Sequence, residues 1–469
     1  MTSNELVVKT YVSGATVLLA MNLKKKATKN LAGFAILCAP TNKPSYYLDN
    51  RINFKSGAQS SKNQWTPSNI APFQKFRWVH VLQGRQIEGI YNYTVTAMYF
   101  TSNTKLIAGA STSVSVNLSP PHKNAMIGFT RGYISSQAYV DKFNNKPIRP
   151  VKKTLDFDTT PYQDQYKWLG GQARKLLFSF LAEALKDPSI TIDLFAYDLD
   201  EPDFIKKLQK LKGRLRAILD NASLHTKPGA LEIEAASRLK ESAGEKNVLQ
   251  GHFKRFAHSK VLIQKKLGRP IKVLTGSANF SIRGFYVQAN NILVFNNPQI
   301  ADKYEEAFQT AFTDMKNFQK SQIASQWFDF HIQNLPSMSI AFSPHISANV
   351  SLDSVEKSIK EAKTSILFSV MSLRGSGSIL ESLRNLISRK NIFSYGISQM
   401  ANGLDLFKPG NNRAKFAAFA YLNGSIPENF KQEWSGGSGQ TIHHKFIVVD
   451  FNGDNPIVFT GSSNLAAGV

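Results

Sequence analysis

The 469-residue chain is 42% apolar and 11% aromatic, which is enough for several folded cores and excludes wholesale disorder. Its single cysteine, Cys38, excludes an internal disulfide and a multi-cysteine metal site. The net charge is +24, of which residues 1–150 carry +14, from 18 Lys and Arg against 4 Asp and Glu. This positive surplus favours an anionic binding partner over a role in solubility alone.

Residues 1–120 alternate apolar and polar side chains in short runs, for example at 5–12, 90–100 and 106–118. Alternation with a period of two predicts an all-β sandwich. Within it, the run Tyr-Thr-Val-Thr-Ala at 93–97 resembles the tyrosine-corner strand of a fibronectin type III or immunoglobulin-like domain. A turn-rich stretch lies at 57–63, and we expect residues 121–165 to be a linker.

From residue 166 onward, helical and strand-like segments alternate. The order helix, strand, helix, strand occurs twice, at 169–185, 190–199, 203–211 and 215–219, and again at 355–362, 365–373, 378–389 and 392–397. Such alternation predicts mixed sheets covered by helices. We therefore expect an α/β region of two pseudo-symmetric halves, residues 166–335 and 336–469.

Each half carries the same polar pattern at a constant offset of 185 residues. A histidine is followed two residues later by a lysine, and a Gly-Ser-x-Asn turn begins 18 residues after the histidine. The residues are His258, Lys260, Ser277 and Asn279 in the first copy, and His443, Lys445, Ser462 and Asn464 in the second. A single histidine or Gly-Ser turn is commonplace, but four matched positions in two copies indicate a functional site.

An apolar run follows each His-x-Lys pair, so each pair begins a strand. Side chains two residues apart on a strand share a face. His258 and Lys260 are therefore expected to face the same way, as are His443 and Lys445. His444 is expected to point to the opposite side.

The paired segments resemble the HKD motifs of the phospholipase D superfamily, His-x-Lys-x4-Asp followed by Gly-Ser-x-Asn, over residues 165–469. The resemblance implies an α/β catalytic region that cleaves phosphodiesters through a phosphohistidine intermediate, without a cofactor or a metal. It also implies that His258 is the nucleophile and His443 the general acid. The residues alone leave that order open, because the two copies are equivalent.

The side-chain chemistry suits this reaction. Imidazole acts as nucleophile or acid near neutral pH. Lys260 and Lys445 can neutralise phosphate oxygens, and Asn279 and Asn464 can donate amide hydrogen bonds. Ser277 and Ser462 are expected to be supporting donors.

Two features depart from the family pattern. Asp450 stands seven residues after His443, where the pattern has its acid, but Lys265 takes that place after His258. We expect Asp450 to be a supporting residue and the first copy to have weaker local support. The first copy continues through another strand at 290–295, whereas five residues follow Asn464, so we expect a truncated second half.

The substrate class stays open between a phospholipid, which is slightly favoured, and a nucleic acid. Basic and aromatic residues mix at 75–78 and 254–256, as nucleic-acid binding would need. A third alternative is an inactive, basic binding protein. We expect a cytoplasmic protein with no transmembrane segment and no obligate oligomer. Its positive charge is compatible with peripheral contact with an anionic membrane.

Overall fold

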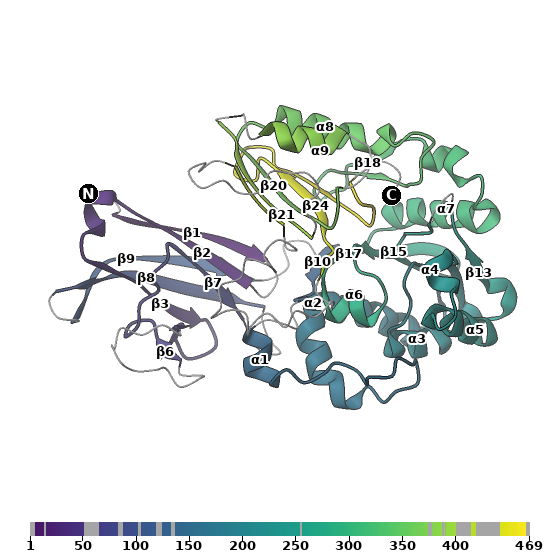
Figure 1. Cartoon of the computed structure of the whole chain (residues 1–469), viewed down its shortest axis with the longest axis horizontal. Coiled ribbons are helices and arrows are strands. Elements are labelled where there is room, and N and C mark those ends of the chain that lie inside the picture. Colours follow the sequence, from purple (N-terminus) through teal and green to yellow (C-terminus); the bar gives the residue numbers. More distant parts are fainter. Residues whose placement is uncertain are drawn as a thin grey trace. The chain divides into compact units, whose positions relative to one another are not determined.

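The computed structural model describes residues 5–13, 16–50, 65–82, 88–101, 105–118, 124–132, 137–253, 256–373, 378–386, 389, 391–399, 414–418 and 441–465. The predicted turn at 57–63 and the basic residues Lys254 and Arg255 lie outside this part of the chain. The chain divides into two compact units, Met1–Pro121 and His122–Val469 (Figure 1). We describe each unit by itself.

The first unit is β-rich, as predicted. One antiparallel sheet has the order β1-β2-β7, and a second has the order β4-β3-β8-β9. Their bounds are β1 Leu6–Ser13, β2 Thr16–Leu23, β3 Leu31–Pro40, β4 Tyr46–Tyr47, β7 Arg77–Val81, β8 Ile90–Phe100 and β9 Leu106–Asn117; a small pair is formed by β5 Asp49–Asn50 and β6 Thr66–Pro67. Alternate residues of β2 are buried and pack with residues of β3 and β8 in one core. The likeness to a fibronectin or immunoglobulin domain stays a prediction.

Tyr93 connects the two sheets of this unit. Its hydroxyl lies 2.9 Å from Nδ1 of His80, which comes from β7 in the other sheet. A tyrosine corner bonds a backbone group instead. The buried hydrogen bond is therefore a link between sheets and differs from the tyrosine corner that the sequence resembles.

The second unit contains a seven-stranded sheet whose two faces are both covered. Its order is β10-β17-β15-β14-β11-β12-β13, with bounds Ala125–Phe129, Asn291–Phe295, Arg269–Gly276, Val261–Lys266, Ile190–Ala196, Leu215–Asp220 and Val248–Gly251. Helices α2 (Gln163–Lys186), α3 (Pro202–Gln209) and α5 (Leu231–Ala243) share a core with one face. Helix α7 (Pro298–Asp314) packs against the other. Burial of both faces explains why the neighbouring parallel strands β11 and β12 are mostly apolar.

The segment expected to be a linker contributes to this unit. Strand β10 pairs with β17 at the edge of the seven-stranded sheet. Further along, Tyr139, Leu155 and Phe157 are buried in the core beneath α2. Residues 124–132 and 137–165 are thus part of the α/β unit, which their mixed composition did not indicate.

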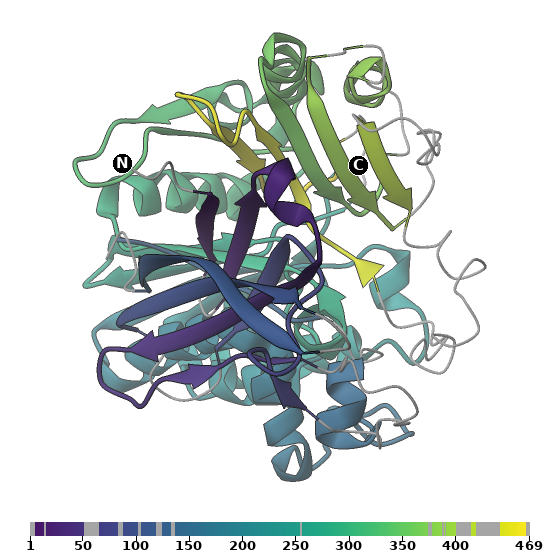
Figure 2. The same ribbon diagram turned by 90° about the vertical axis from the view of Figure 1, so that its left-hand side faces the viewer.

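A five-stranded sheet follows, with the order β22-β21-β20-β24-β25. The bounds are Ala414–Ala418, Phe393–Ser398, Ser365–Val370, Lys445–Val449 and Ile457–Thr460. Its strand directions match those of β13-β12-β11-β14-β15, with parallel pairs on one side of the first strand and antiparallel pairs on the other. Figure 2 shows β20, β21 and β22 side by side in green. Helices α8 (Asn349–Glu361) and α9 (Ser378–Asn385) cover one face.

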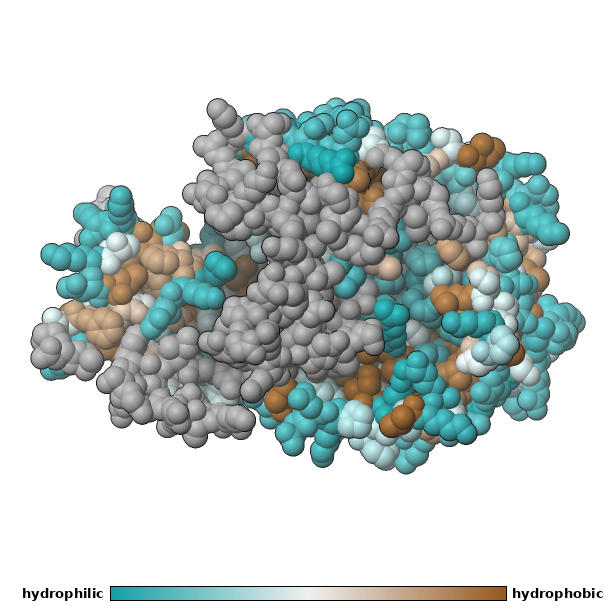
Figure 3. Space-filling view, viewed as in Figure 1, coloured by the Kyte–Doolittle hydropathy of each residue, from teal (hydrophilic) through white to brown (hydrophobic). Residues whose placement is uncertain are grey.

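Among the coloured side chains in the view of Figure 3, most are hydrophilic, and hydrophobic ones gather in smaller patches. Among the described helices, none combines the length and apolarity that crossing a bilayer requires.

Candidate active site

The first His-x-Lys pair lies immediately before β14. Lys260 is only 1% exposed, and its Nζ donates a hydrogen bond to the carbonyl of His258 at 2.6 Å. The ring of Tyr197, which follows β11, lies 4.5 Å from the imidazole of His258 and 4.8 Å from the Lys260 ammonium. The two side chains therefore meet at one aromatic ring.

The second pair repeats this arrangement at the start of β24. Lys445 is 1% exposed, and its Nζ donates to the carbonyl of His443 at 2.8 Å. His444 instead packs against the rings of Phe129 and Phe446. The neighbouring histidines thus have different surroundings, as period-two alternation would produce.

A separate two-stranded sheet joins the segment after β15 to the segment that contains His443. Strand β16 (Gln288–Ala289) pairs in parallel with β23 (Thr441–Ile442), and the backbone N–H of His443 donates to Ala289 at 3.1 Å. His443 Nδ1 lies 2.8 Å from Oδ1 of Asn290 and 3.1 Å from the carbonyl of Ser277. Both partners are acceptors, so Nδ1 carries the hydrogen and Nε2 keeps a lone pair.

Burial and nearby positive charge favour the neutral form of both histidines. Burial, followed by the charges of Lys260 and Lys445, holds the pKa of His258 well below its ordinary value, although the backbone of Ser462 raises it. Burial and the same two lysines lower the pKa of His443. Burial also lowers the pKa of Lys260 to about 7, against the opposing effect of Asp198 and Asp220. Both lysines thus act electrostatically on both histidines.

The two Gly-Ser-x-Asn turns have buried polar ends. Gly276 adopts φ +145°, and a Cβ there would lie 2.3 Å from the carbonyl oxygen of Asn291, so the turn requires glycine. The hydroxyl of Ser277 lies 2.8 Å from Asn290 Oδ1 and accepts from the backbone N–H of Asn291. Ser277 is therefore occupied in holding the neighbouring strand. We predicted a supporting donor, and its support is structural.

Asn279 also has an internal partner. Its Nδ2 donates to Asp198 at 2.5 Å, while its buried Oδ1 has no hydrogen-bond partner in the part of the chain that the structure describes. Oδ1 of Asn464 is likewise buried without a partner. Each amide nitrogen has two hydrogens, so Asn279 keeps one for a further acceptor.

Comparison with known proteins agrees with this arrangement. Residues 181–312 match the family model "Cardiolipin synthase, PLD-like domain". This segment is therefore similar to a phospholipase D-like domain. No curated protein matches the chain. The match covers part of the seven-stranded sheet and includes the first His-x-Lys pair.

Several solved structures are similar to the chain. Nuc, a phospholipase D family member from Salmonella typhimurium, is 23% identical over 29% of this chain and 86% of its own, with a TM-score of 0.24. Phosphatidylserine synthase from Haemophilus influenzae is 13% identical over 58% and 73%, with a TM-score of 0.36. Yeast tyrosyl-DNA phosphodiesterase is 12% identical over 60% and 78%, with a TM-score of 0.30.

Asp450 supports the second sheet at a distance from the His-x-Lys pair. It follows β24 at the end opposite Lys445, and its carboxylate accepts hydrogen bonds from the backbone of Lys363, Thr364 and Ser365. Burial raises its pKa, but these bonds outweigh burial and lower the pKa to about 2. After the first His-x-Lys pair, Lys265 takes the equivalent place and pairs with buried Asp193 at 2.5 Å. The first copy is thus supported by an ion pair.

The Asp450→Ala variant is expected to lose about 1–2 kcal/mol of unfolding free energy, because several backbone donors at the start of β20 lose their acceptor. Since the folded pKa is depressed, the wild-type contribution is present above about pH 4 and is lost as the pH falls through 2. Urea unfolding at pH 7 measures the loss. Diester turnover should stay near the wild-type rate, and a large fall in a folded variant would contradict a purely structural role.

Sequence patterns missed several residues around the first His-x-Lys pair. Buried Asp220 and His225 form a hydrogen-bonded chain with half-buried Asp198 beside His258, and Asn290 orients His443. The one available signal was that Asp198 and Asp220 both follow apolar runs that pair as the parallel strands β11 and β12. The carboxyl ends of such strands commonly carry site residues.

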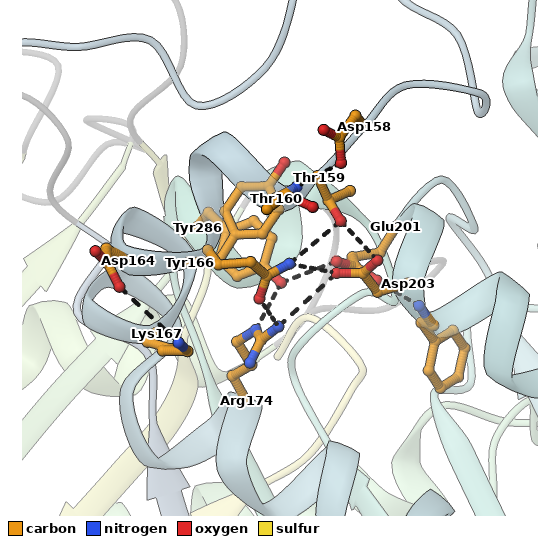
Figure 4. A network of polar contacts seen from close by, with 12 residues as sticks. Asp158, Thr159, Thr160, Asp164, Tyr166, Lys167, Arg174, Glu201, Asp203 and Tyr286 are labelled. Carbon is orange, nitrogen blue, oxygen red and sulfur yellow. Dashed lines mark hydrogen bonds and ion pairs between the residues drawn. The ribbon is translucent and has the colours of Figure 1, made fainter.

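A second polar network stands behind the Asn279 turn (Figure 4). The carboxylate of Glu201 accepts from the hydroxyl of Tyr286 at 2.9 Å and from the N–H of Phe204, where it caps α3. Arg174 donates to the same hydroxyl at 3.0 Å. The backbone of Glu201 also bonds the carbonyl of Phe280, so the network ties the end of β11 to the Asn279 turn.

Glu201 makes stability depend on pH. Burial, followed by repulsion from Asp203, raises its pKa to about 7. The folded state therefore holds a proton that the unfolded state releases above about pH 4.5, and the unfolding free energy falls as the pH rises from about 4.5 to 7. The Glu201→Gln variant should lose this contribution, so it should gain about 2 kcal/mol relative to wild type between pH 5 and pH 7.5. If the difference in unfolding free energy between wild type and variant were the same at both pH values, the raised pKa of Glu201 would be refuted.

Proposed function

We propose that the protein is a phospholipase D-type phosphodiesterase with one active site, formed by two pseudo-symmetric halves. The observation that carries the proposal is the contact of His443 with Ser277 and Asn290, which joins the second His-x-Lys pair to the turn of the first copy. The ammonium groups of Lys260 and Lys445 are buried and bond no carboxylate among the described residues. This supports the proposal further, because an anionic substrate would supply the missing charge.

In the proposed reaction, the neutral imidazole of His258 attacks phosphorus, and a nitrogen–phosphorus bond forms as the ester bond to the leaving oxygen breaks. His443 gives that oxygen its proton. Water then attacks the phosphohistidine, His443 takes the water's proton, and the nitrogen–phosphorus bond breaks. Bound phosphate raises the pKa of His443 and of both lysines, so substrate binding is what protonates the acid. An alcohol in place of water would give transfer.

A phospholipid is the proposed substrate class. The match to a family described as cardiolipin synthase supports it, and the names of similar structures include both a phosphatidylserine synthase and a DNA phosphodiesterase. The net charge of +24 supports nucleic acid instead. Peripheral contact with an anionic membrane would bring phospholipid substrates to the site.

Turnover of bis(p-nitrophenyl) phosphate in EDTA tests the activity itself. We expect wild-type protein to hydrolyse it, and His258→Ala and His443→Ala to lose steady-state turnover by about 1,000-fold or more. His331→Ala is a matched control, because His331 is exposed and bonds only the hydroxyl of Ser337. No turnover by folded wild-type protein would favour the inactive binding protein, and wild-type rates in both site variants would refute the site.

A side-by-side assay decides the substrate class. Anionic liposomes and single-stranded DNA are offered to the wild-type protein at equal phosphate concentration, with His443→Ala as the blank. Release of a lipid headgroup alone supports the phospholipid proposal, whereas cleavage of DNA alone replaces it with a nuclease.

A further inference from the structure

His225, on the short helix α4 (Ser223–Thr226), is clamped between two carboxylates. It is 3% exposed, with Nδ1 at 2.7 Å from Asp220 Oδ2 and Nε2 at 3.0 Å from Asp198 Oδ1. Ionised carboxylates only accept hydrogen bonds, so both ring nitrogens must donate. The ring is therefore an imidazolium. Although burial lowers its pKa, the two aspartates outweigh burial and raise the pKa to about 9.

The other oxygen of each carboxylate accepts a hydrogen bond from a segment of the first motif copy. Asp220 Oδ1 accepts from the backbone N–H of Ala257, the residue before His258, at 2.5 Å. Asp198 Oδ2 accepts from Nδ2 of Asn279 at 2.5 Å. His225 thus connects the segment that enters β14 to the turn that leaves β15, which are the two parts of the first motif copy.

A metal ion is the competing interpretation of this cluster. Asp198, His225 and Glu232 each offer a ligand atom, and these atoms lie within 4.8 Å of one another. A metal needs a lone pair on the imidazole, and both nitrogens of His225 already carry hydrogens that point to carboxylates. The hydrogen bonds therefore favour a fixed organic cation over a metal ligand.

The cation lies close to His258. The ring of Tyr197 contacts both imidazoles at centroid distances of 4.5 Å, and the charge of His225 is among the causes that lower the pKa of His258. The titratable groups that face His225 are Tyr197 and Asp198 after β11, Asp220 on β12, Glu232 on α5 and His258 before β14.

We propose that His225 is a positioning residue: as a fixed cation it holds Asp198 and Asp220, through them orients Asn279 and the backbone before His258, and keeps His258 free of a proton. The inference rests on the proposed function for its catalytic consequence. The clamp itself is independent of any activity.

The pH profile of His225→Gln tests the catalytic part. Removing the cation leaves two carboxylates uncompensated, so the pKa values of His258 and Lys260 should both rise. We expect kcat/KM for bis(p-nitrophenyl) phosphate to fall about 10- to 100-fold and its whole pH profile to move upward by about one unit. His225→Lys keeps the positive charge and should restore the position of the profile, while His331→Gln should leave both rate and profile unchanged. A lower rate with an unmoved profile would overturn the electrostatic role.

Nitrogen-15 NMR of the wild-type imidazoles tests the clamp without turnover, so its failure is distinct from failure of the proposed function. One histidine should stay doubly protonated at pH 8, titrate near pH 9 and lose its signal in His225→Gln. Addition of Zn²⁺ or Mg²⁺ should leave that resonance in place. A neutral His225 at pH 8 would refute the clamp. A shift of its resonance on addition of Zn²⁺ or Mg²⁺ would replace the clamp with a metal site.

Discussion

The His443→Ala variant is expected to release one equivalent of p-nitrophenol from bis(p-nitrophenyl) phosphate and then to stall. p-Nitrophenolate is a good leaving group that departs without a proton, so His258 can still attack phosphorus. The second step needs a base to activate water, and that base is missing in the variant. Rapid mixing at high protein concentration measures the burst, and mass spectrometry under alkaline conditions detects the phosphohistidine.

The His258→Ala variant distinguishes this scheme from its mirror image. It lacks the nucleophile, so we expect neither a burst nor a covalent adduct. A burst in His258→Ala together with none in His443→Ala would exchange the two roles, which the equivalence of the motif copies allows. Absence of an adduct in both folded variants, with wild-type turnover intact, would exclude a phosphohistidine mechanism.

The Lys260→Met variant should lose activity and gain stability. Its ammonium is 1% exposed, and burial lowers its pKa to about 7, far below the value of an unfolded lysine. At pH 7 and below, the folded state bears the cost of a buried charge, and that cost declines as the pH rises toward about 10. We expect a gain of about 1–2 kcal/mol in unfolding free energy at pH 6 and a loss of about 100- to 1,000-fold in kcat.

Lys265→Met provides a control of opposite sign. Lys265 is partnered by the buried carboxylate of Asp193, so its removal should destabilise the protein while diester turnover stays near wild type. The two lysines are five residues apart: Lys260 lies immediately before β14 and Lys265 lies within it. If both variants lost stability equally, the buried charge of Lys260 would not be destabilising the folded state.

Much of the site was predictable because it is encoded locally. Side-chain alternation along a strand is a short-range property of the backbone, so the sequence alone indicated the strands after Lys260 and Lys445 and the separate surroundings of His444. The constant offset of 185 residues identified the two motif copies without any knowledge of packing. The β-rich first unit followed from the same period-two reasoning.

The tertiary structure alone decided which groups hold those residues in place. Asn290 and His443 are 153 residues apart, and Asp198 and Asn279 are 81 apart, so no local spacing records either hydrogen bond. The role of Ser277 depends on β17 lying beside β15, and the place of residues 124–132 depends on an unpaired edge of β17. Local sequence specifies periodicity and turn chemistry, whereas the charge of a buried imidazole such as His225 depends on which distant carboxylates the fold brings to it.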